Sequence, residues 1–310
     1  MIQVENLTKK FGKITAVDNI SFNIKESEIF GFLGPNGAGK TTTIRILSTL
    51  IKPSDGKILI NGKDPKKNGE HIRSIIGLLT ETPGMYEKIS AYENLDYFSS
   101  FYNISDKLRR ANIEKFLKMF DLWDRKDDLV KAYSKGMKQK LALARALIHE
   151  PKILFLDEPT AGLDPESAHM VRTFIEGLKN EQTTVFLCTH NLEEASNLSD
   201  VVCIIKTKIL KIATLSELQN SKKFKNVEIL FKNDAERYLK ILDSFEDIKS
   251  KSTLENKIKI SLENPETLNP IIIKKLIENG AEILYFNEIK ASLEEIYLDL
   301  IKEDHNEKRA

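Results

Sequence analysis

The chain has 310 residues, of which 41% are hydrophobic and 30% charged, and its formal net charge is +1. This length favours two domains, and the near-zero charge excludes a protein whose whole surface binds nucleic acid. No apolar run reaches the length of about 18 residues that a membrane-spanning helix needs, the N-terminus has no apolar signal-peptide core, and the two cysteines, Cys188 and Cys203, exclude a disulfide scaffold. These features predict a cytoplasmic protein with two buried thiols.

The first two thirds of the chain alternate between strand and helix patterns. Apolar alternation predicts strands within residues 2–24, and the apolar run 28–34 predicts a buried strand that ends in glycine. Residues 52–64 predict a hairpin with turns at Asp55-Gly56 and Asn61-Gly62. The other elements expected are a helix over 41–50, a strand over 74–79, a helical block over about 82–150, a strand over 153–156, a helix over 165–178, a strand over 184–189 and two antiparallel strands within 201–213. This alternation predicts an α/β fold with a mostly parallel sheet and an inserted helical subdomain at about 82–150.

A second domain is predicted after a polar, basic linker at residues 220–223, so that the domains span 1–219 and 220–310. Pro270 is expected in the first turn of its helix, and Ser292 is expected to form a capping box with Glu295. The elements expected in this domain are strands over 227–231, 257–262 and 283–287 and helices over 234–245, 270–279 and 293–301. They predict a small α+β domain with its own core.

Residues 34–42 read GPNGAGKTT and match the phosphate-binding pattern G-x-x-x-x-G-K-[ST] between a predicted strand and a predicted helix. The glycines permit a tight turn whose N–H groups point at phosphate oxygens, and the positive N-terminal end of the helix strengthens this attraction. Lys40 is expected to contact the terminal phosphates, and Thr41 to bind Mg²⁺. A glycine-rich turn that binds nothing is the alternative. The predicted phosphate-binding residues are Gly34, Pro35, Asn36, Gly37, Ala38, Gly39, Lys40, Thr41 and Thr42.

Two further predicted strands end in polar residues. Asp157 ends the apolar run ILFLD and is predicted to hold Mg²⁺, and Glu158 is then placed to polarise the attacking water as a general base. His190 follows TVFLCT and is predicted to contact the γ-phosphate or the attacking water. An ordinary acidic turn and a structural histidine are the alternatives.

Four segments occur in order along the chain: GPNGAGKTT from residue 34, YSKGMKQKLALARAL from residue 133, ILFLDEPTAGLDP from residue 153, and TH at 189–190. Together they resemble the ATP-binding cassette (ABC) of ABC transporters over about residues 1–218. The likeness extends to an exporter branch that includes sodium-efflux, bacitracin-resistance and daunorubicin-resistance-type ATPases. Cassettes of this branch often read SKGMKQK and carry a small C-terminal domain, whose end the segment SLEEIYLDL resembles.

The resemblance implies a P-loop NTPase core with an antiparallel β subdomain, an inserted helical subdomain and a small C-terminal α+β domain. It also implies further site residues. Phe11 matches the aromatic residue that stacks on adenine, with a core aromatic as the alternative. Ser134 and Gly136 match the signature loop, which closes over the γ-phosphate bound by a second cassette. Asp164 matches the loop that links the two active sites across the dimer.

The chain departs from the family pattern at two places. The common signature is LSGGQ, whereas Tyr133, Lys135 and Met137 take the places of its leucine, second-position glycine and glutamine. The signature serine is kept, so that contact with the γ-phosphate is still expected. Glu81 replaces the glutamine that binds Mg²⁺ and senses the membrane partner. A carboxylate also binds Mg²⁺, and an exposed loop acid is the alternative.

The resemblance implies the ATP-hydrolysing subunit of an exporter that uses ATP and Mg²⁺ and lies at the inner face of the cell membrane. The implied partners are a second cassette, in a homodimer or heterodimer, and an integral-membrane permease on another chain. Among the aromatic residues that follow Glu81, Tyr86 is expected to be exposed at the permease interface. The C-terminal domain is expected to steady the dimer, with a solubilising cap as the alternative. No nucleic-acid partner is expected, although a soluble ABC ATPase that acts on the ribosome or DNA, and a purely regulatory cassette, are alternatives.

Overall fold

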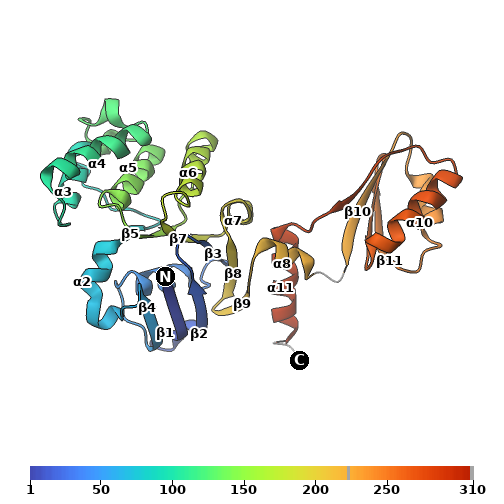
Figure 1. The fold of residues 1–310 in the computed structure, drawn as a ribbon, viewed down its shortest axis with the longest axis horizontal. Helices are drawn as coiled ribbons and strands as arrows, with labels where there is room; N and C mark the ends of the chain where they lie inside the picture. Colours follow the sequence, from blue (N-terminus) through green and yellow to red (C-terminus); the bar gives the residue numbers. More distant parts are fainter. Residues whose placement is uncertain (222–223, 308–310) are drawn as a thin grey trace. The chain divides into compact units, whose positions relative to one another are not determined.

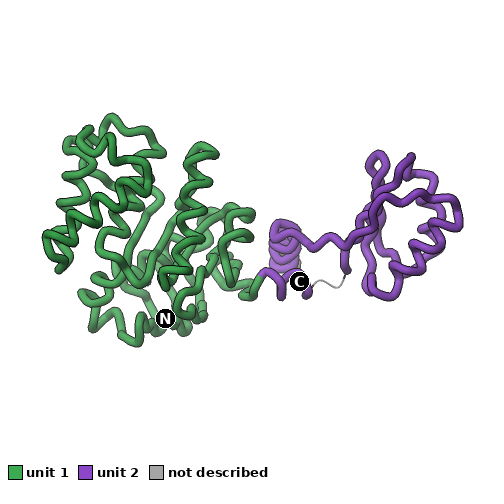
Figure 2. Tube along the Cα trace, turned by 45° about the horizontal axis from the view of Figure 1, so that its top comes forward, with its two compact units in different colours: residues 1–214 green, residues 215–310 purple. Residues whose placement is uncertain are grey.

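The computed structural model describes residues 1–221 and 224–307. The chain divides into two compact units, Met1–Thr214 and Leu215–Ala310, which Figure 2 shows in green and purple. The boundary predicted from the sequence lies slightly later, after residue 219, and Lys222 and Lys223 of the predicted linker lie outside the described residues. Each unit has a hydrophobic core of its own.

The central sheet of the first unit has the strand order β5-β6-β7-β3-β8-β9 (Figure 1). Neighbouring strands pair in parallel except β9, which is antiparallel to β8. The parallel strands are apolar and almost fully buried, as is typical of a sheet covered on both faces. Their bounds are β3 (Ile29–Leu33), β5 (Ile76–Leu79), β6 (Ile153–Asp157), β7 (Thr184–Thr189), β8 (Val201–Lys206) and β9 (Lys208–Ala213). Because the carboxyl ends of parallel strands meet at one edge, the residues that follow β3, β6 and β7 lie close together.

An antiparallel sheet with the order β2-β1-β4 lies beside the central sheet, and its strands are β1 (Ile2–Phe11), β2 (Ile14–Ile24) and β4 (Asp55–Ile60). The hairpin predicted over residues 52–64 is wrong, because Asp55-Gly56 begins β4 and this strand pairs with β1. Gly56 has a φ of +97°, and a Cβ there would lie 2.6 Å from the carbonyl oxygen of Asn6. Glycine thus marks the close approach of two strands and not a turn, whereas Asn61-Gly62 does turn the chain between Ile60 and Lys63.

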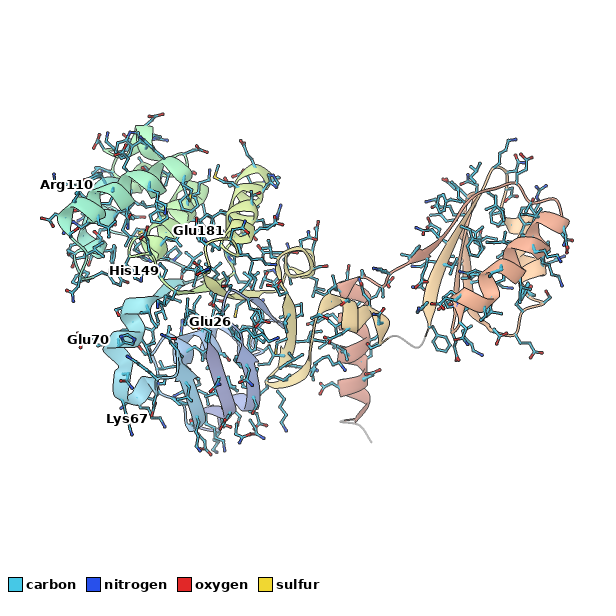
Figure 3. The ribbon with its side chains drawn as sticks, in the orientation of Figure 1. Glu26, Lys67, Glu70, Arg110, His149 and Glu181 are labelled. Atoms are coloured by element: carbon cyan, nitrogen blue, oxygen red, sulfur yellow. The ribbon has the colours of Figure 1, made fainter. Side chains whose placement is uncertain are left out.

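Helices pack against the central sheet, and two of them are not predicted from the sequence. The predicted helices are α1 (Lys40–Leu47) and α6 (Pro165–Gly177), and the unpredicted ones are α2 (Pro65–Ile75) and α7 (Leu192–Leu198). Lys67 and Glu70 are exposed on α2 (Figure 3), where Ile72 is the residue that is fully buried. An apolar stripe this narrow gives little helical periodicity in the sequence.

The segment between β5 and β6 forms the predicted helical subdomain, whose helices lie together at one end of the unit (Figure 1). Serine side chains cap its helices by accepting a backbone N–H: Ser90 caps α3 (Ala91–Ser99), Ser105 caps α4 (Asp106–Met119) and Ser134 caps α5 (Lys135–Leu147). Short 3₁₀ turns connect α4 to α5 at Trp123–Arg125 and Val130–Ala132.

The core beneath the antiparallel sheet is rich in phenylalanine. Rings of Phe22, Phe30 and Phe186 lie in mutual contact, with centroids 5.4 to 6.1 Å apart. Cys188 and Cys203 are buried free thiols in the same core, which confirms the prediction from the sequence. No helix in residues 1–221 and 224–307 combines the length and apolar character needed to cross a membrane.

The second unit contains an antiparallel sheet with the order β11-β12-β10-β13. Its strands are β10 (Lys225–Phe231), β11 (Ile248–Leu254), β12 (Lys257–Leu262) and β13 (Ile283–Ile289), and its helices are α8 (Leu215–Asn220), α9 (Leu239–Leu242, after the 3₁₀ turn Glu236–Tyr238), α10 (Pro265–Glu278) and α11 (Leu293–Glu307). The placement of Pro270 in the first turn is wrong, because Pro265 begins α10 and Pro270 lies inside it. Pro265 satisfies the first-turn rule, whereas Pro270 gives up one helical hydrogen bond. The Ser292 hydroxyl accepts the N–H of Glu295 at 3.1 Å, which is one of the two bonds of the predicted capping box.

Candidate functional site

The predicted phosphate-binding turn and the polar ends of β6 and β7 open into one pocket of about 610 Å³ in the first unit. The sheet order explains the meeting, since β3 leads into the turn and β6 and β7 are its parallel neighbours. The residues around the pocket are Phe11, Ala16, Asn36, Gly37, Ala38, Gly39, Lys40, Thr41, Thr42, Glu81, Asp157, Glu158, Ala161 and His190. No feature of the sequence identifies Ala16 or Ala161 as a pocket residue.

The turn between β3 and α1 depends on glycine. Gly37 and Gly39 have φ values of +82° and +100°, in the left-handed region that side chains disfavour. A Cβ on Gly39 would also lie 2.5 Å from the carbonyl oxygen of Ala16. The first turn of α1 contains no acidic residue, so the positive end of the helix faces the pocket uncompensated. The turn is therefore suited to an anion.

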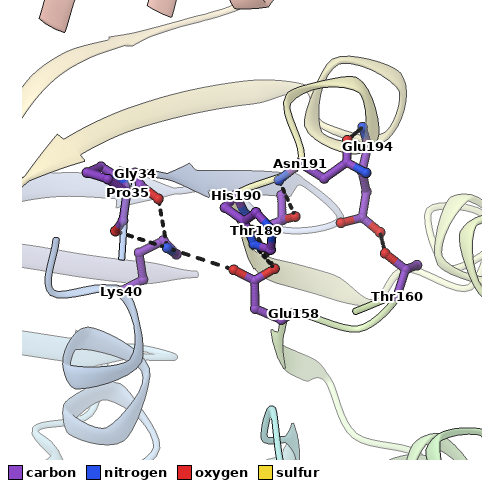
Figure 4. A network of polar contacts seen from close by, with 9 residues as sticks. All are labelled: Gly34, Pro35, Lys40, Glu158, Thr160, Thr189, His190, Asn191 and Glu194. Carbon is purple, nitrogen blue, oxygen red and sulfur yellow. Dashed lines mark hydrogen bonds and ion pairs between the residues drawn. The ribbon is translucent and has the colours of Figure 1, made fainter. Parts of the chain in front are cut away.

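Lys40 is buried and its ammonium group is held by the turn itself (Figure 4). Nζ donates to the carbonyl oxygens of Gly34 at 2.7 Å and Pro35 at 3.3 Å. Oε1 of Glu158 lies 3.8 Å from the same nitrogen, which is too long for a hydrogen bond. The cation is thus fixed in place, and its charge is available to a ligand in the pocket.

Asp157 is 1% exposed, and its Oδ1 atom has no hydrogen-bond partner among the described residues. Burial raises the pKa of this carboxyl, while the Thr41 hydroxyl lowers it by hydrogen bonding; Glu158 and Glu81 raise it further, and Lys40 lowers it. Hard divalent cations prefer oxygen donors. The unpaired Oδ1 atom of Asp157 lies beside the Thr41 hydroxyl and the carboxylate of Glu158, and all of these are donors of that kind. These residues therefore fit a bound Mg²⁺.

Glu158 and His190 face each other across the ends of β6 and β7 (Figure 4). Nδ1 of His190 lies 2.8 Å from Oε2 of Glu158, and the backbone N–H of Glu158 donates to the carbonyl of Cys188 at 2.9 Å. The Glu158 side chain is 10% exposed, against 61% for His190. Glu158 also adopts a φ of +54°, a strained value for this residue type that is typical of functional sites. The carboxylate is thus held rigidly at the pocket.

Phe11 ends β1 at the rim of the pocket and is 49% exposed. Nζ of Lys9 lies 4.8 Å from the centre of the ring. An exposed flat aromatic surface beside an anion-binding turn is suited to a ligand that has both an aromatic ring and a negative charge.

The predicted residues Ser134, Gly136 and Asp164 do not line this pocket. Ser134 is exposed at the start of α5, where its hydroxyl accepts the backbone N–H of Met137 at 3.2 Å. A Cβ on Gly136 would lie 3.5 Å from Oδ2 of Asp164, which shows that the two segments lie against each other. Asp164 caps α6, and the backbone N–H of Ser167 holds the pKa of its carboxyl below the usual value. These residues form a second surface of the unit.

An exposed aromatic patch follows Glu81 and consists of Tyr86, Tyr97 and Phe101. Tyr86 is 51% exposed, which confirms its predicted exposure. The buried amide of Asn94 fixes its backbone, accepting the N–H of Tyr86 and donating to its carbonyl oxygen, each at 2.9 Å. The patch therefore rests on a rigid support.

A polar network behind His190 is absent from the sequence predictions. Thr160 bonds Glu194, and Asn191 caps α7 by accepting the N–H of Glu194 at 3.1 Å (Figure 4). A sequence signal for the cap exists, since Asn191 is followed three residues later by glutamate, a pattern typical of helix starts. The contact with Thr160 has no such signal, because it is a tertiary contact.

Comparisons with known proteins agree with this geometry. The family model described as ABC transporter matches residues 17–161, and the model described as the C-terminal domain of DrrA1-3-like ATP-binding proteins matches residues 214–301. The bacitracin transport ATP-binding protein BcrA of Bacillus licheniformis is 36% identical over 97% of this chain and 97% of its own length. The fluoroquinolones export ATP-binding protein MT2762 of Mycobacterium tuberculosis is 36% identical over 76% of this chain and 77% of its own length.

A solved structure is similar over the first unit. It is described as a dimeric structure of a post-hydrolysis state of the ATP-binding cassette MJ0796 bound to ADP and Pi. It superposes with a TM-score of 0.64 and 28% identity over 69% of this chain and 98% of that chain. The predicted fold class is confirmed.

Proposed function

The chain belongs to the ABC transporter family of ATP-binding proteins, and we therefore propose that it hydrolyses ATP to drive export through a permease on a separate chain. The observation that carries the proposal is the single pocket in which a rigid phosphate cradle, the buried Asp157 and the Glu158–His190 pair meet. Relatives named for bacitracin transport and fluoroquinolone export support the direction of transport.

In this proposal the phosphates of ATP bind the turn at the start of α1, with Lys40 on the terminal phosphates. Asp157, Thr41 and Glu81 would hold Mg²⁺, which when bound neutralises charge on the phosphate oxygens. Glu158 takes a proton from the water that attacks the γ-phosphorus, as the bond from that phosphorus to the ADP oxygen breaks. Nδ1 of His190 fixes the Glu158 carboxylate, and the exposed edge of the His190 ring points towards the γ-phosphate.

Replacing Phe11 tests the place of the adenine ring. Stacking of a base on an aromatic side chain contributes about 1–3 kcal/mol, so we expect Phe11→Ala to weaken ATP binding about tenfold. Phe11→Trp keeps an aromatic surface and serves as the matched control. Affinities for ATP and for inorganic triphosphate, measured by calorimetry, separate the two parts of the ligand. Equal losses for both ligands would contradict stacking on adenine.

Ser134 does not line the pocket of its own chain, and we place it against the γ-phosphate of a second cassette. The similar cassette MJ0796, which is described as dimeric, supports a partner of this kind. Ser134→Asp keeps the helix cap, since aspartate caps as well as serine, but adds a negative charge beside the phosphate. We expect this variant to bind ATP as a monomer and to lose the ATP-driven dimer on size exclusion. Ser134→Asn, an uncharged cap, should retain far more of the dimer. Full dimerisation of Ser134→Asp would contradict the placement.

The permease would dock on the aromatic patch of Tyr86, Tyr97 and Phe101, because aromatic side chains suit the centre of protein interfaces. We expect Tyr86→Glu to abolish co-purification with a co-expressed candidate permease and to lower permease-stimulated hydrolysis about tenfold or more, since interface aromatics often contribute about 2 kcal/mol. Leu254→Glu, a substitution at an exposed apolar residue of the second unit, is the control. Unchanged co-purification of Tyr86→Glu would argue against this docking surface.

The proposed location is the cytoplasmic face of the cell membrane, where the permease would hold the chain. The second unit has a core of its own around β10, β12 and α10. We assign it a contact with its copy in the second subunit, which would steady the dimer when ATP is released.

A further inference from the structure

Glu194 is a buried carboxylate beside the site, and the proposed mechanism gives it no role. It lies in the first turn of α7 and is 1% exposed. A carboxylate removed from water is costly unless hydrogen-bond donors surround it. The fold therefore has to supply donors from neighbouring segments.

Thr160 supplies a donor across the site. Its hydroxyl donates to Oε1 of Glu194 at 2.8 Å (Figure 4). Burial raises the pKa of the Glu194 carboxyl, and the hydroxyls of Thr189 and Thr160 oppose that shift. Thr160 belongs to the turn that contains Glu158, whereas Glu194 belongs to the helix that follows His190. The bond therefore joins the same two segments as the Glu158–His190 contact.

Both contacts are partly buried, and each ends on a buried carboxylate. The low local dielectric around these carboxylates strengthens a hydrogen bond to either of them. The Thr160–Glu194 bond is thus a second side-chain contact between the two segments, in addition to the Glu158–His190 contact and the backbone bond from Glu158 to Cys188.

We propose that Glu194 is a positioning residue for ATP hydrolysis, which acts through Thr160 to hold the Glu158 turn against the His190 loop. This inference rests on the proposed function, because it requires Glu158 and His190 to act on ATP. Neither Glu194 nor Thr160 lines the pocket, so the effect falls on the rate of the chemical step and not on ATP binding.

Thr160→Val removes the hydroxyl at nearly constant volume. We expect kcat to fall about tenfold, because small misplacement of reacting groups is costly, with KM for ATP little changed. The melting temperature should also fall, because a buried carboxylate loses a hydrogen-bond donor. Glu194→Ala should show the same loss, and the double variant no more than either, since both remove one bond. Glu194→Gln keeps an oxygen that accepts the bond and should restore most of kcat. Wild-type kcat in Thr160→Val, or fully additive losses, would overturn the inference.

The matched control is Glu28→Gln. Glu28 is another buried carboxylate of the same unit, whose Oε2 accepts the N–H of Lys25 at 2.7 Å away from the pocket. It should keep wild-type kcat. His190→Ala tests whether Thr160 acts through the Glu158–His190 contact. If it does, adding Thr160→Val to His190→Ala should cause no further loss of kcat. If His190→Ala is impaired and Thr160→Val is not, Glu194 has no positioning role and the proposed function stands. If His190→Ala hydrolyses ATP normally, the roles assigned to His190 and Glu194 both fail, while the proposed hydrolysis of ATP stands.

Discussion

Glu158→Gln is expected to reduce the kcat of ATP hydrolysis about 100-fold or more, because a positioned general base contributes about 10² to 10⁴ in rate. The amide has the size of the carboxylate and can still accept a hydrogen bond from His190, so the pocket should stay intact. ATP binding is therefore expected to persist, and the variant should accumulate as an ATP-bound dimer. Phosphate release and size exclusion of the purified chain measure the two effects.

The control for this substitution is Glu193→Gln, which removes an exposed carboxylate from the same α7 region and does not line the pocket. It should hydrolyse ATP at the wild-type rate. If Glu158→Gln also hydrolyses ATP at that rate, Glu158 is not the base, and the strained backbone at this residue needs another explanation.

Lys40→Met is expected to weaken ATP binding about 100-fold or more. Methionine keeps the length of the side chain, while the variant loses charge-assisted hydrogen bonds that contribute about 1.5–3 kcal/mol each. The carbonyls of Gly34 and Pro35 hold the ammonium at the turn, and Lys40 is the lysine among the residues that line the pocket. Equilibrium dialysis with labelled ATP gives the affinity directly.

Lys63→Ala, which removes an exposed lysine that does not line the pocket, controls for the change in net charge. Equal affinities of Lys40→Met and the wild type would show that the turn holds phosphate without its lysine, or that ATP binds elsewhere.

Much of the site follows from patterns that are local in sequence. A buried strand, a glycine-rich turn and a helix start place Lys40, and the apolar runs before Asp157 and His190 end at the same sheet edge. Parallel pairing then brings the ends together without any further information. The roles of these residues stay predictions, while their meeting in one pocket is a feature of the structure.

The features that could not be predicted from the sequence either lack a regular hydrophobic pattern or depend on residues far away in the chain. Helix α2 buries little more than Ile72 and is interrupted at Asn68, whose backbone is not helical. Strand β11 lies at a sheet edge and exposes polar residues such as Lys249 and Lys251, a composition that protects edges and conceals the strand. The role of Glu194 depends on Thr160, which is 34 residues away in the sequence. No local pattern reports such a contact.

Equilibrium binding of labelled ATP to the purified chain in magnesium buffer shows whether the pocket at the start of α1 binds ATP. We expect saturable binding at one site per chain, which excess unlabelled ATP displaces and which Lys40→Met weakens strongly. If the folded chain retains no labelled ATP at any concentration tested, the pocket is not an ATP site and the proposed function fails.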